Sequence, residues 1–267
     1  MTTSNPQQPF RLSVIIPTYN RRTLVERAVK SVLAQEDPIS TEIIVADDGS
    51  RDGTKDHLDS IFFDAVQSRK LRVIECKRSG DPGATRNQGV EASSGTFLAF
   101  LDSDDYWRPG RLQWLEPLLS KKDFILTPTE YPGESSDWLQ TYLRINLGHT
   151  SSIVVRRTLF NSVGGFPQGY FGILLPKRLP GFEDYEFLLK CFCKLAHPEQ
   201  NQRILVAKNQ HVVIEHQQSG SGRMALKSQM LRETMTLMRI ASILPKRYWP
   251  LLSRRIAGAG KAMVLGR

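Results

Sequence analysis

Three carboxylates stand within four residues, directly after an apolar run of the chain. The apolar run is FLAFL at 97–101, and the sequence DSDD follows at 102–105. Carboxylates this close repel one another strongly and need a compensating cation. Oxygen ligands without a neighbouring histidine or cysteine suit Mg²⁺ or Mn²⁺, ions that usually bridge protein carboxylates to substrate phosphates. The segment therefore predicts a Mn²⁺ or Mg²⁺ site that holds a nucleoside diphosphate.

Two similar polar clusters follow two other apolar runs. PTYN occupies 17–20 after LSVII, and DDGS occupies 47–50 after EIIVA. A DDGS sequence standing alone is ordinarily a turn. In an open parallel sheet, however, ligands bind at the carboxyl ends of the strands. Polar clusters at three strand ends therefore favour a binding site along one edge of the sheet.

The first hundred residues alternate between strand and helix patterns. Apolar runs, two of them rich in β-branched residues, predict buried parallel strands at 12–16, 42–46, 71–74 and 97–101. Between the first two strands, Thr23 and Glu26 form a capping-box pattern ahead of apolar residues at helical spacing. A second helix is predicted at 84–94. This alternation predicts an α/β fold, a doubly wound domain with a Rossmann-like, mostly parallel sheet flanked by helices.

The second half of the chain has a less regular pattern. Strands are predicted near 152–156, 203–207 and 211–215, and helices near 183–196, 225–244 and 247–257. Pro245 separates the last two helices, because proline interrupts a helix interior. The pattern therefore predicts a helical appendage at the C-terminal end of the α/β domain.

The motifs that the sequence lacks exclude several common protein classes. There is no G-x-x-x-x-G-K-[ST] P-loop and no G-x-G-x-x-G after the first predicted strand. The three cysteines match no zinc or disulfide framework, which favours a reducing compartment. No signal-peptide pattern and no run of eighteen apolar residues occurs. We therefore expect a cytoplasmic protein.

Four segments in order resemble the motifs of family 2 glycosyltransferases, which are inverting enzymes with the GT-A fold. The segments are SVIIPTYNR, IIVADDGSRDGT, GATRNQGVEASSGTFLAFLDSDD and GFEDYEF. The resemblance covers residues 11–222 and implies transfer of a sugar from a nucleotide-diphosphate sugar, usually UDP-linked, to a hydroxyl acceptor. It also implies a catalytic domain over 1–222, with a nucleotide-binding half at about 11–107 and an acceptor-binding half at about 108–222.

The resemblance assigns the nucleotide-sugar site to the first three motifs. Pro17, Tyr19 and Asp48 are implied to hold the base, with Tyr19 stacking on the ring and Asp48 accepting from the base imide. Thr18 and Asn20 belong to the same motif and are expected beside the nucleotide. Arg86 matches an alanine-arginine-asparagine element that either positions the nucleotide or braces the loop.

The Asp-x-Asp motif of the family maps to residues 102–104. Asp102, with Ser103, is implied to face the ribose or the sugar, and Asp104 is implied to bind the metal on the diphosphate. Asp105 is either a further metal ligand or the N-cap of a following helix. His216 resembles a late family histidine near the diphosphate, and a satisfied structural histidine is the alternative.

An inverting displacement needs a carboxylate that takes the proton of the acceptor hydroxyl. In the family this base is the aspartate of a Glu-Asp pair that opens a helix, and the pair maps to Glu183 and Asp184. The resemblance thus implies that Asp184 is the catalytic base. The alternative is that both acids only stabilise the start of the helix electrostatically.

The net charge of +9 is confined to the C-terminal segment. Residues 223–267 contain ten Lys or Arg residues and a single acid, Glu233. Such a basic helical tail either lies on an anionic membrane surface or packs on the catalytic domain with its charges in water. In the first case the enzyme would be peripheral at the inner face of the membrane, where it would reach a lipid-linked acceptor. Other expected acceptors are a saccharide or a protein hydroxyl.

Two other functions fit parts of the sequence less well. A nucleotidyltransferase acting on a sugar phosphate usually has a glycine-rich basic loop after the first strand, which PTYNRR lacks. A non-catalytic nucleic-acid-binding protein would explain the basic tail, but the preceding 222 residues are electrically balanced and contain no recognisable nucleic-acid module. No nucleic-acid partner is therefore expected.

Overall fold

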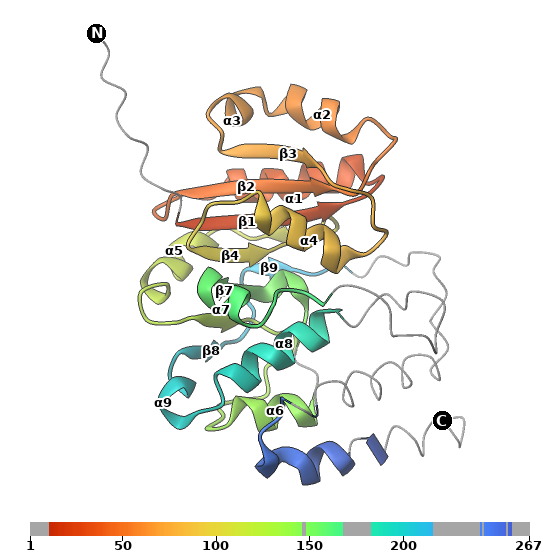
Figure 1. Cartoon of the computed structure of the whole chain (residues 1–267). Helices are drawn as coiled ribbons and strands as arrows, with labels where there is room; N and C mark the ends of the chain where they lie inside the picture. The colour runs from red at the N-terminus through yellow and green to blue at the C-terminus, as the bar shows by residue number, and fades with distance from the viewer. Residues whose placement is uncertain are drawn as a thin grey trace.

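A computed structural model describes residues 11–145, 148–167, 183–215, 241, 243–254 and 256–257. In this part of the chain a seven-stranded sheet forms the centre, in the order β3-β2-β1-β4-β7-β6-β8 (Figure 1). A separate two-stranded sheet pairs β5 with β9. The strands are β1 (Leu12–Thr18), β2 (Thr41–Asp47), β3 (Leu71–Glu75), β4 (Phe97–Phe100), β5 (Tyr106–Trp107), β6 (Phe124–Leu126), β7 (Ile153–Arg156), β8 (Ile204–Val206) and β9 (Val212–Val213).

The first four strands are parallel, as the sequence predicts. β1 lies between β2 and β4, with Leu12 opposite both Thr41 and Phe97. β3 extends the sheet on the other side of β2. The next strand in the sheet, β7, runs antiparallel to both β4 and β6. The carboxyl ends of β1, β2 and β4 therefore meet at one edge, where the three polar clusters begin.

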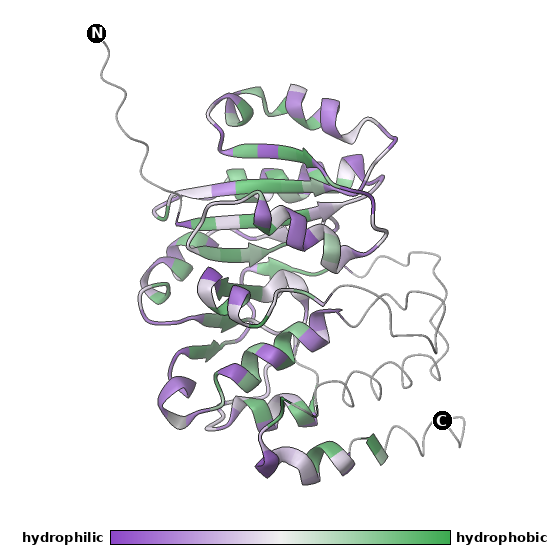
Figure 2. Cartoon of the chain, viewed as in Figure 1, coloured by the Kyte–Doolittle hydropathy of each residue, from purple (hydrophilic) through white to green (hydrophobic). Residues whose placement is uncertain are grey.

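Helices cover both faces of the sheet, and their apolar sides make two cores (Figure 2). Ile15 belongs to the core on one face, and its neighbours Val14 and Ile16 belong to the core on the other. This alternation follows from the two-residue period of a strand, and burial on both faces explains the continuous apolar runs. The helices are α1 (Arg22–Leu33), α2 (Thr54–Ile61), α3 (Phe63–Gln67), α4 (Pro82–Glu91), α5 (Arg111–Leu115), α6 (Trp138–Arg144), α7 (Arg157–Ser162), α8 (Glu183–Lys194) and α9 (Pro198–Asn201), with 3₁₀ turns η1 (Glu116–Leu118), η2 (Thr150–Ser152) and η3 (Lys246–Tyr248).

The first predicted helix exists, but its predicted capping box does not. α1 begins at Arg22, and no side chain caps its first turn. Glu26 instead contacts Lys30, one turn along the same helix, and accepts from Nε2 of His57, on α2, at 2.7 Å. The capping-box prediction is therefore wrong, because a tertiary contact with α2 holds the Glu26 carboxylate.

Helix α4 packs unusually close to the sheet and opens beside its carboxyl edge. Asp81 caps it by accepting from the backbone N–H of Gly83 at 2.9 Å. A Cβ placed at Gly89 would stand 2.6 Å from Cγ2 of Ile15, so only glycine permits this approach. α4 thus brings Arg86, which lies between these two glycines, against the ends of the central strands.

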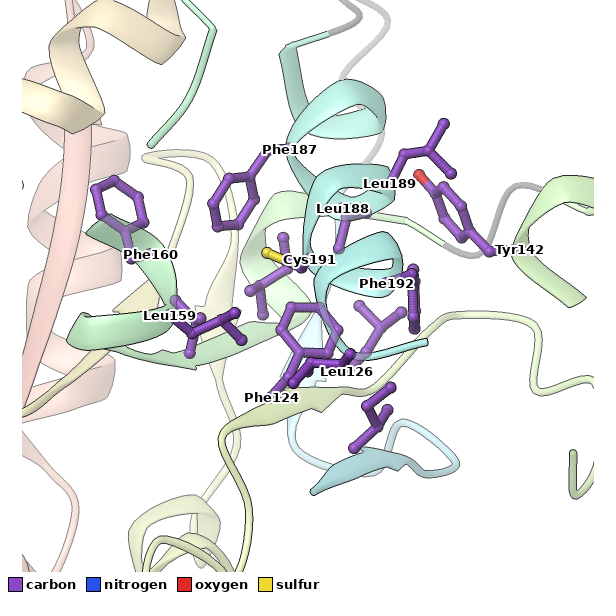
Figure 3. Close-up of a cluster of buried hydrophobic side chains, with 14 of the residues drawn as sticks. Phe124, Leu126, Tyr142, Leu159, Phe160, Phe187, Leu188, Leu189, Cys191 and Phe192 are labelled. Carbon is purple, nitrogen blue, oxygen red and sulfur yellow. The ribbon is translucent and has the colours of Figure 1, made fainter. Parts of the chain in front are cut away.

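Helix α8 matches the predicted helix and anchors the second half of the domain. Phe187, Cys191 and Phe192 point from it into an apolar cluster with Phe124 of β6 and side chains of α6 and α7 (Figure 3). β8 and β9 fall inside the predicted strands at 203–207 and 211–215. The short elements β5, β6 and α5 to α7 were not predicted, since runs of two to seven residues give little periodicity.

Part of the basic tail packs on the α/β domain. Leu244, Tyr248 and Leu252 are at most 5% exposed and belong to the same apolar cluster as α8. The Tyr248 hydroxyl donates to Asp137 Oδ2, at the start of α6, at 2.7 Å. The helix predicted at 225–244 lies almost wholly outside the described residues. Within the described ranges, the structure contains no helix with the length and apolar character needed to cross a bilayer.

Candidate active site

A cavity of about 480 Å³ opens at the carboxyl edge of β1, β2 and β4. Its wall includes side chains from three strand ends, from the start of α4 and from the start of α8. The predicted site residues that line it are Pro17, Thr18, Tyr19, Asp48, Arg86, Asp102, Ser103, Asp104 and Asp184. The sequence therefore located most of this wall correctly.

Two predicted residues do not line the cavity, and a third is not described. Asn20 has a left-handed backbone with φ of 49° and does not line the cavity. Its N–H donates to Ser50 Oγ at 2.8 Å and its Oδ1 accepts from Arg51 N–H at 2.7 Å, so it joins two strand-end loops. Direct contact of Asn20 with the nucleotide is therefore not supported. Asp105 also lies outside the wall, and His216 falls outside the described residues.

Asp48 and Tyr19 form one end of the cavity. Asp48 is buried, and its carboxylate accepts from the backbone N–H groups of Ser79 at 2.6 Å and Gly80 at 2.7 Å. The Arg78 guanidinium lies 4.7 Å from the centre of the Tyr19 ring and donates to the Tyr19 hydroxyl at 2.7 Å. Asp48 thus also holds the turn before α4, a structural role that the sequence did not predict.

Arg86 connects the strand-end carboxylates with the start of α8. It donates to Asp102 Oδ1 at 2.6 Å and to Glu183 Oε1 at 3.2 Å. Burial disfavours the charged guanidinium, but Asp102 and Glu183 outweigh this effect and raise the pKa of Arg86. Burial likewise opposes ionisation of Asp102, yet Arg86 keeps the pKa of Asp102 below its ordinary value. Arg86 therefore stabilises two negative charges inside the site.

Asp104 and Asp105 have different surroundings although they are adjacent. Asp104 faces the cavity, and its Oδ2 accepts from Arg21 Nη1 at 3.0 Å. Asp105 is 1% exposed; it accepts from the Ser151 hydroxyl, and from the backbone N–H of Glu215 at 3.0 Å. Burial raises the pKa of Asp105 to about 6.

The helix N-cap alternative for Asp105 is wrong. The residues that follow it, Tyr106–Trp107, form strand β5 and pair with β9. Asp105 instead lies beside a histidine, with 3.6 Å between Asp105 Oδ2 and His149 Nδ1. Ligand atoms of Asp102, Asp105 and His149 all lie within 4.8 Å of one another. These three side chains and Asp104 offer oxygen and imidazole donors suited to a divalent cation.

Asp184 and Glu183 open α8 and line the cavity together with the residues at the ends of β1, β2 and β4. Glu183 is paired with Arg86, whereas burial, with the neighbouring Glu183 charge, raises the pKa of Asp184 to about 6. The backbone N–H of Tyr185 donates to Asp184 Oδ1 at 2.6 Å. Two adjacent acids thus differ in their environments, and the one with the raised pKa suits proton transfer near neutral pH.

Sequence reasoning undervalued two residues of the wall, Arg21 and His149. Arg21 directly follows PTYN, so its position beside the predicted site was a usable signal. His149 had no such signal, because it comes close to Asp105 only through the antiparallel pairing of β7 with β4. The remaining unpredicted lining residues are Gly80, Asp81, Pro82, Thr85 and Thr150, and Glu183 lines the cavity as the first acid of the predicted Glu-Asp pair.

Comparison with known proteins places this site in a described family. Residues 13–174 match the model of glycosyl transferase family 2. The chain is 39% identical over 105 residues to the GalNAc(5)-diNAcBac-PP-undecaprenol beta-1,3-glucosyltransferase of Campylobacter jejuni, a match that covers 39% of this chain and 33% of that protein. Matches to three further curated relatives cover 39%, 35% and 28% of their lengths, so the chain spans well under half of those proteins.

Two solved structures share the fold. S. aureus TarS, solved with UDP-GlcNAc, superposes with a TM-score of 0.65 at 21% identity, covering 93% of this chain and 71% of that chain. The mannosyltransferase PcManGT from Pyrobaculum calidifontis, solved with GDP-Man and Mn²⁺, superposes with a TM-score of 0.63 at 16% identity, covering 97% and 75%. The sheet order, the flanking helices and these likenesses establish the GT-A fold. The chain belongs to glycosyl transferase family 2.

Proposed function

We propose that this protein transfers a sugar from a nucleotide-diphosphate sugar, with UDP as the carrier, to an acceptor hydroxyl with inversion. One observation carries the proposal. Asp102 and Asp104, which follow β4, and Asp184, which opens α8 and has a raised pKa, line a single cavity. A displacement needs a leaving-group site and a base around one sugar, and two separate elements of the chain supply these groups here.

The donor would occupy the side of the cavity formed by β1, β2 and β4. Tyr19 offers a partly exposed aromatic face for the base, and Asp48 retains acceptor capacity beside it. Asp102 and Ser103 would contact the ribose or the sugar, while Arg86 keeps Asp102 ionised. The nucleotide sugars bound by TarS and PcManGT support this donor class.

The donor set fits a Mn²⁺ or Mg²⁺ ion. Asp104 offers a carboxylate at the cavity wall, and the Asp102, Asp105 and His149 group offers further ligands next to it. Nδ1 of His149 is buried, and within the described part of the chain it has no hydrogen-bond partner, which leaves it available as a ligand atom. The predicted role of His216 as a metal ligand stays a prediction, because this residue lies outside the described residues. A bound divalent ion would neutralise the charge that develops on the departing diphosphate.

Asp184 would act as the catalytic base. The acceptor oxygen attacks the anomeric carbon as the bond from that carbon to the diphosphate oxygen breaks, and the hydroxyl proton passes to Asp184. With a pKa of about 6, Asp184 is mostly ionised at neutral pH and still basic enough to take the proton. Glu183 stays bound to Arg86 and keeps the start of α8 in place.

The acceptor and the cellular setting are further parts of the proposal. A lipid-linked saccharide is supported by the undecaprenol-linked substrate in the name of the Campylobacter jejuni relative. Such an acceptor agrees with a cytoplasmic enzyme whose basic tail meets an anionic membrane. We assign residues 1–222 to catalysis and 223–267 to the tail, with 11–107 binding the nucleotide and 108–222 binding the acceptor.

A donor screen tests this function. The full-length protein is mixed with Mn²⁺ and a panel of UDP-, GDP-, CDP- and dTDP-sugars, and its melting temperature and slow donor hydrolysis are measured. We expect one or a few UDP-sugars to stabilise the protein and to be hydrolysed. Asp184→Asn should still be stabilised but should hydrolyse the donor far more slowly. Absence of both signals with every nucleotide sugar would contradict the proposal.

A further inference from the structure

Arg21 lines the cavity and forms an ion pair with Asp104, a carboxylate of the same wall. Arg21 connects β1 with α1, lines the cavity, and has 39% of its side chain exposed. Its Nη1 donates to Asp104 Oδ2 at 3.0 Å and to Ser103 Oγ at 3.4 Å. The carboxylate expected to hold a divalent ion therefore already has a positive partner from the chain itself.

The other arginine in the described cavity wall has a different setting. Arg86 is buried and is fixed between Asp102 and Glu183. Arg21 is half-exposed, and Asp104 is its single ion-pair partner among the residues that the structure describes. An exposed single ion pair contributes little stability, whereas removing a cation from between buried carboxylates is costly. Arg21 can therefore leave its partner at small cost, and Arg86 cannot.

A divalent ion and Arg21 would repel each other when both bind Asp104 closely, so each weakens the binding of the other. A displaced Arg21 would remain in the wall of a cavity proposed to hold a diphosphate. Its guanidinium presents paired N–H donors that match phosphate oxygens. The loss of one anionic partner is thus compensated by another within reach of the same side chain.

We propose that Arg21 competes with the divalent ion for Asp104 and, once displaced, binds the diphosphate of the donor. This inference rests on the proposed function and adds a coupling between its two ligands. A nucleotide that draws Arg21 away from Asp104 raises the affinity for the ion, and the ion raises the affinity for the nucleotide equally. Arg21 also acts as the counter-cation of Asp104 in the protein without ligands.

Calorimetric titration of the full-length protein with Mn²⁺ alone and with UDP alone tests the inference. Arg21→Met should bind Mn²⁺ alone about twofold to fivefold more tightly, the weight of an exposed ion pair. The same variant should bind UDP without metal several-fold more weakly. Arg21→Lys keeps the charge, so its affinities for Mn²⁺ and for UDP should lie between those of the wild-type protein and those of Arg21→Met. Arg22→Met is the matched control, because Arg22 is exposed, contacts Asp52 and does not line the cavity.

The opposite directions of the two changes separate this role from general damage to the fold, which would weaken both ligands. Unchanged or weaker Mn²⁺ binding by Arg21→Met, in the absence of nucleotide, would overturn the inference. A wild-type protein that binds UDP in neither the presence nor the absence of Mn²⁺ would instead contradict the proposed function. The two failures are therefore distinguishable.

Discussion

The guanidinium of Arg86, on α4, donates to the carboxylate of Asp102, at the end of β4, at 2.6 Å, with only 4% of the arginine side chain exposed. The pair joins the helix that opens at the cavity to the strand end that carries DSDD. Because α4 also packs closely on β1, the position of Asp102 depends both on α4, through Arg86, and on the packing of α4 against β1. Arg86 therefore contributes both to the stability of the protein and to the geometry of the proposed donor site.

Replacing Arg86 should destabilise the protein strongly. Arg86→Met leaves Asp102 and Glu183 without their shared cation, and breaking a largely buried pair in this way costs about 3 kcal/mol. Urea denaturation at pH 7 measures the change in the free energy of unfolding. Arg156→Met, which removes a more exposed partner of Asp123, is the comparison and should cost less. Equal losses in the two variants would argue against a special role for Arg86.

Activity should depend on ionisation of Asp184. Its pKa of about 6 predicts that kcat/KM falls as pH drops through 6, because the protonated carboxyl cannot accept the acceptor proton. Asp184→Asn should lower kcat by at least about a hundredfold, the usual weight of a general base, and leave donor affinity nearly unchanged. A pH profile of the wild-type transfer rate checks the first point. An asparagine variant with near wild-type kcat would exclude Asp184 as the base.

The free energy of unfolding should fall with rising pH because of Asp184, whereas a carboxylate in an ion pair makes it rise with pH. The folded pKa of Asp184 is raised above its ordinary value of 3.8, so the folded state holds the proton more tightly than the unfolded state. The stabilising contribution of Asp184 to the free energy of unfolding is complete below about pH 4 and is lost as pH rises through 6. Asp184→Asn should therefore flatten the fall in unfolding free energy over this range. Parallel curves for the two proteins would contradict the raised pKa.

Gly89 should tolerate no side chain. A Cβ there would stand 2.6 Å from Ile15 Cγ2 and 3.3 Å from Ala46 Cβ, so Gly89→Ala should cost about 1–3 kcal/mol through overpacking. Glu91→Ala, on the exposed side of the same helix, is the control and should change stability little. Chemical denaturation measures both. A neutral Gly89→Ala variant would mean that α4 can move away from the sheet freely.

Membrane binding, if the tail provides it, should involve the exposed apolar residues of its described part. Ile243 and Trp249 are 49% and 48% exposed, next to the exposed Lys246. Cutting off the whole tail would also remove buried Tyr248, so substitution is the cleaner test. Trp249→Ala should reduce sedimentation with anionic liposomes, because interfacial binding scales with buried apolar area. Phe63→Ala, 60% exposed on α3 at the other end of the molecule (Figure 1), should not. Equal sedimentation of the wild-type protein, Trp249→Ala and Phe63→Ala would exclude Trp249 as a membrane contact.

The first half of the fold was predictable because its strands are buried on both faces. Runs such as IIVA leave a clear apolar signal, and polar residues placed at their ends mark the edge where the cavity forms. Residues adjacent in sequence to those ends, such as Asp48 and Asp104, were therefore located correctly. Asn20 was placed in the wall although it bonds to the next loop, because side-chain direction at a strand end is not visible in the sequence.

Contacts made by later, shorter elements were not predictable. His149 approaches Asp105 because β7 turns antiparallel beside β4, and no local pattern encodes that reversal. Glu215 reaches Asp105 through β9, a strand of two residues. Glu26 abandons the predicted capping box for a contact with His57, 31 residues away along the chain. Each case is a tertiary contact, and that of Glu26 also overrides a local preference.

The most direct test of the account is calorimetric titration of UDP into the full-length protein with and without Mn²⁺. We predict that Mn²⁺ strengthens UDP binding markedly in the wild-type protein and that Asp104→Ala abolishes this effect. Glu91→Ala, away from the cavity, should behave like the wild type. Equal UDP binding with and without Mn²⁺, or full Mn²⁺ dependence in Asp104→Ala, would contradict the metal-dependent donor site.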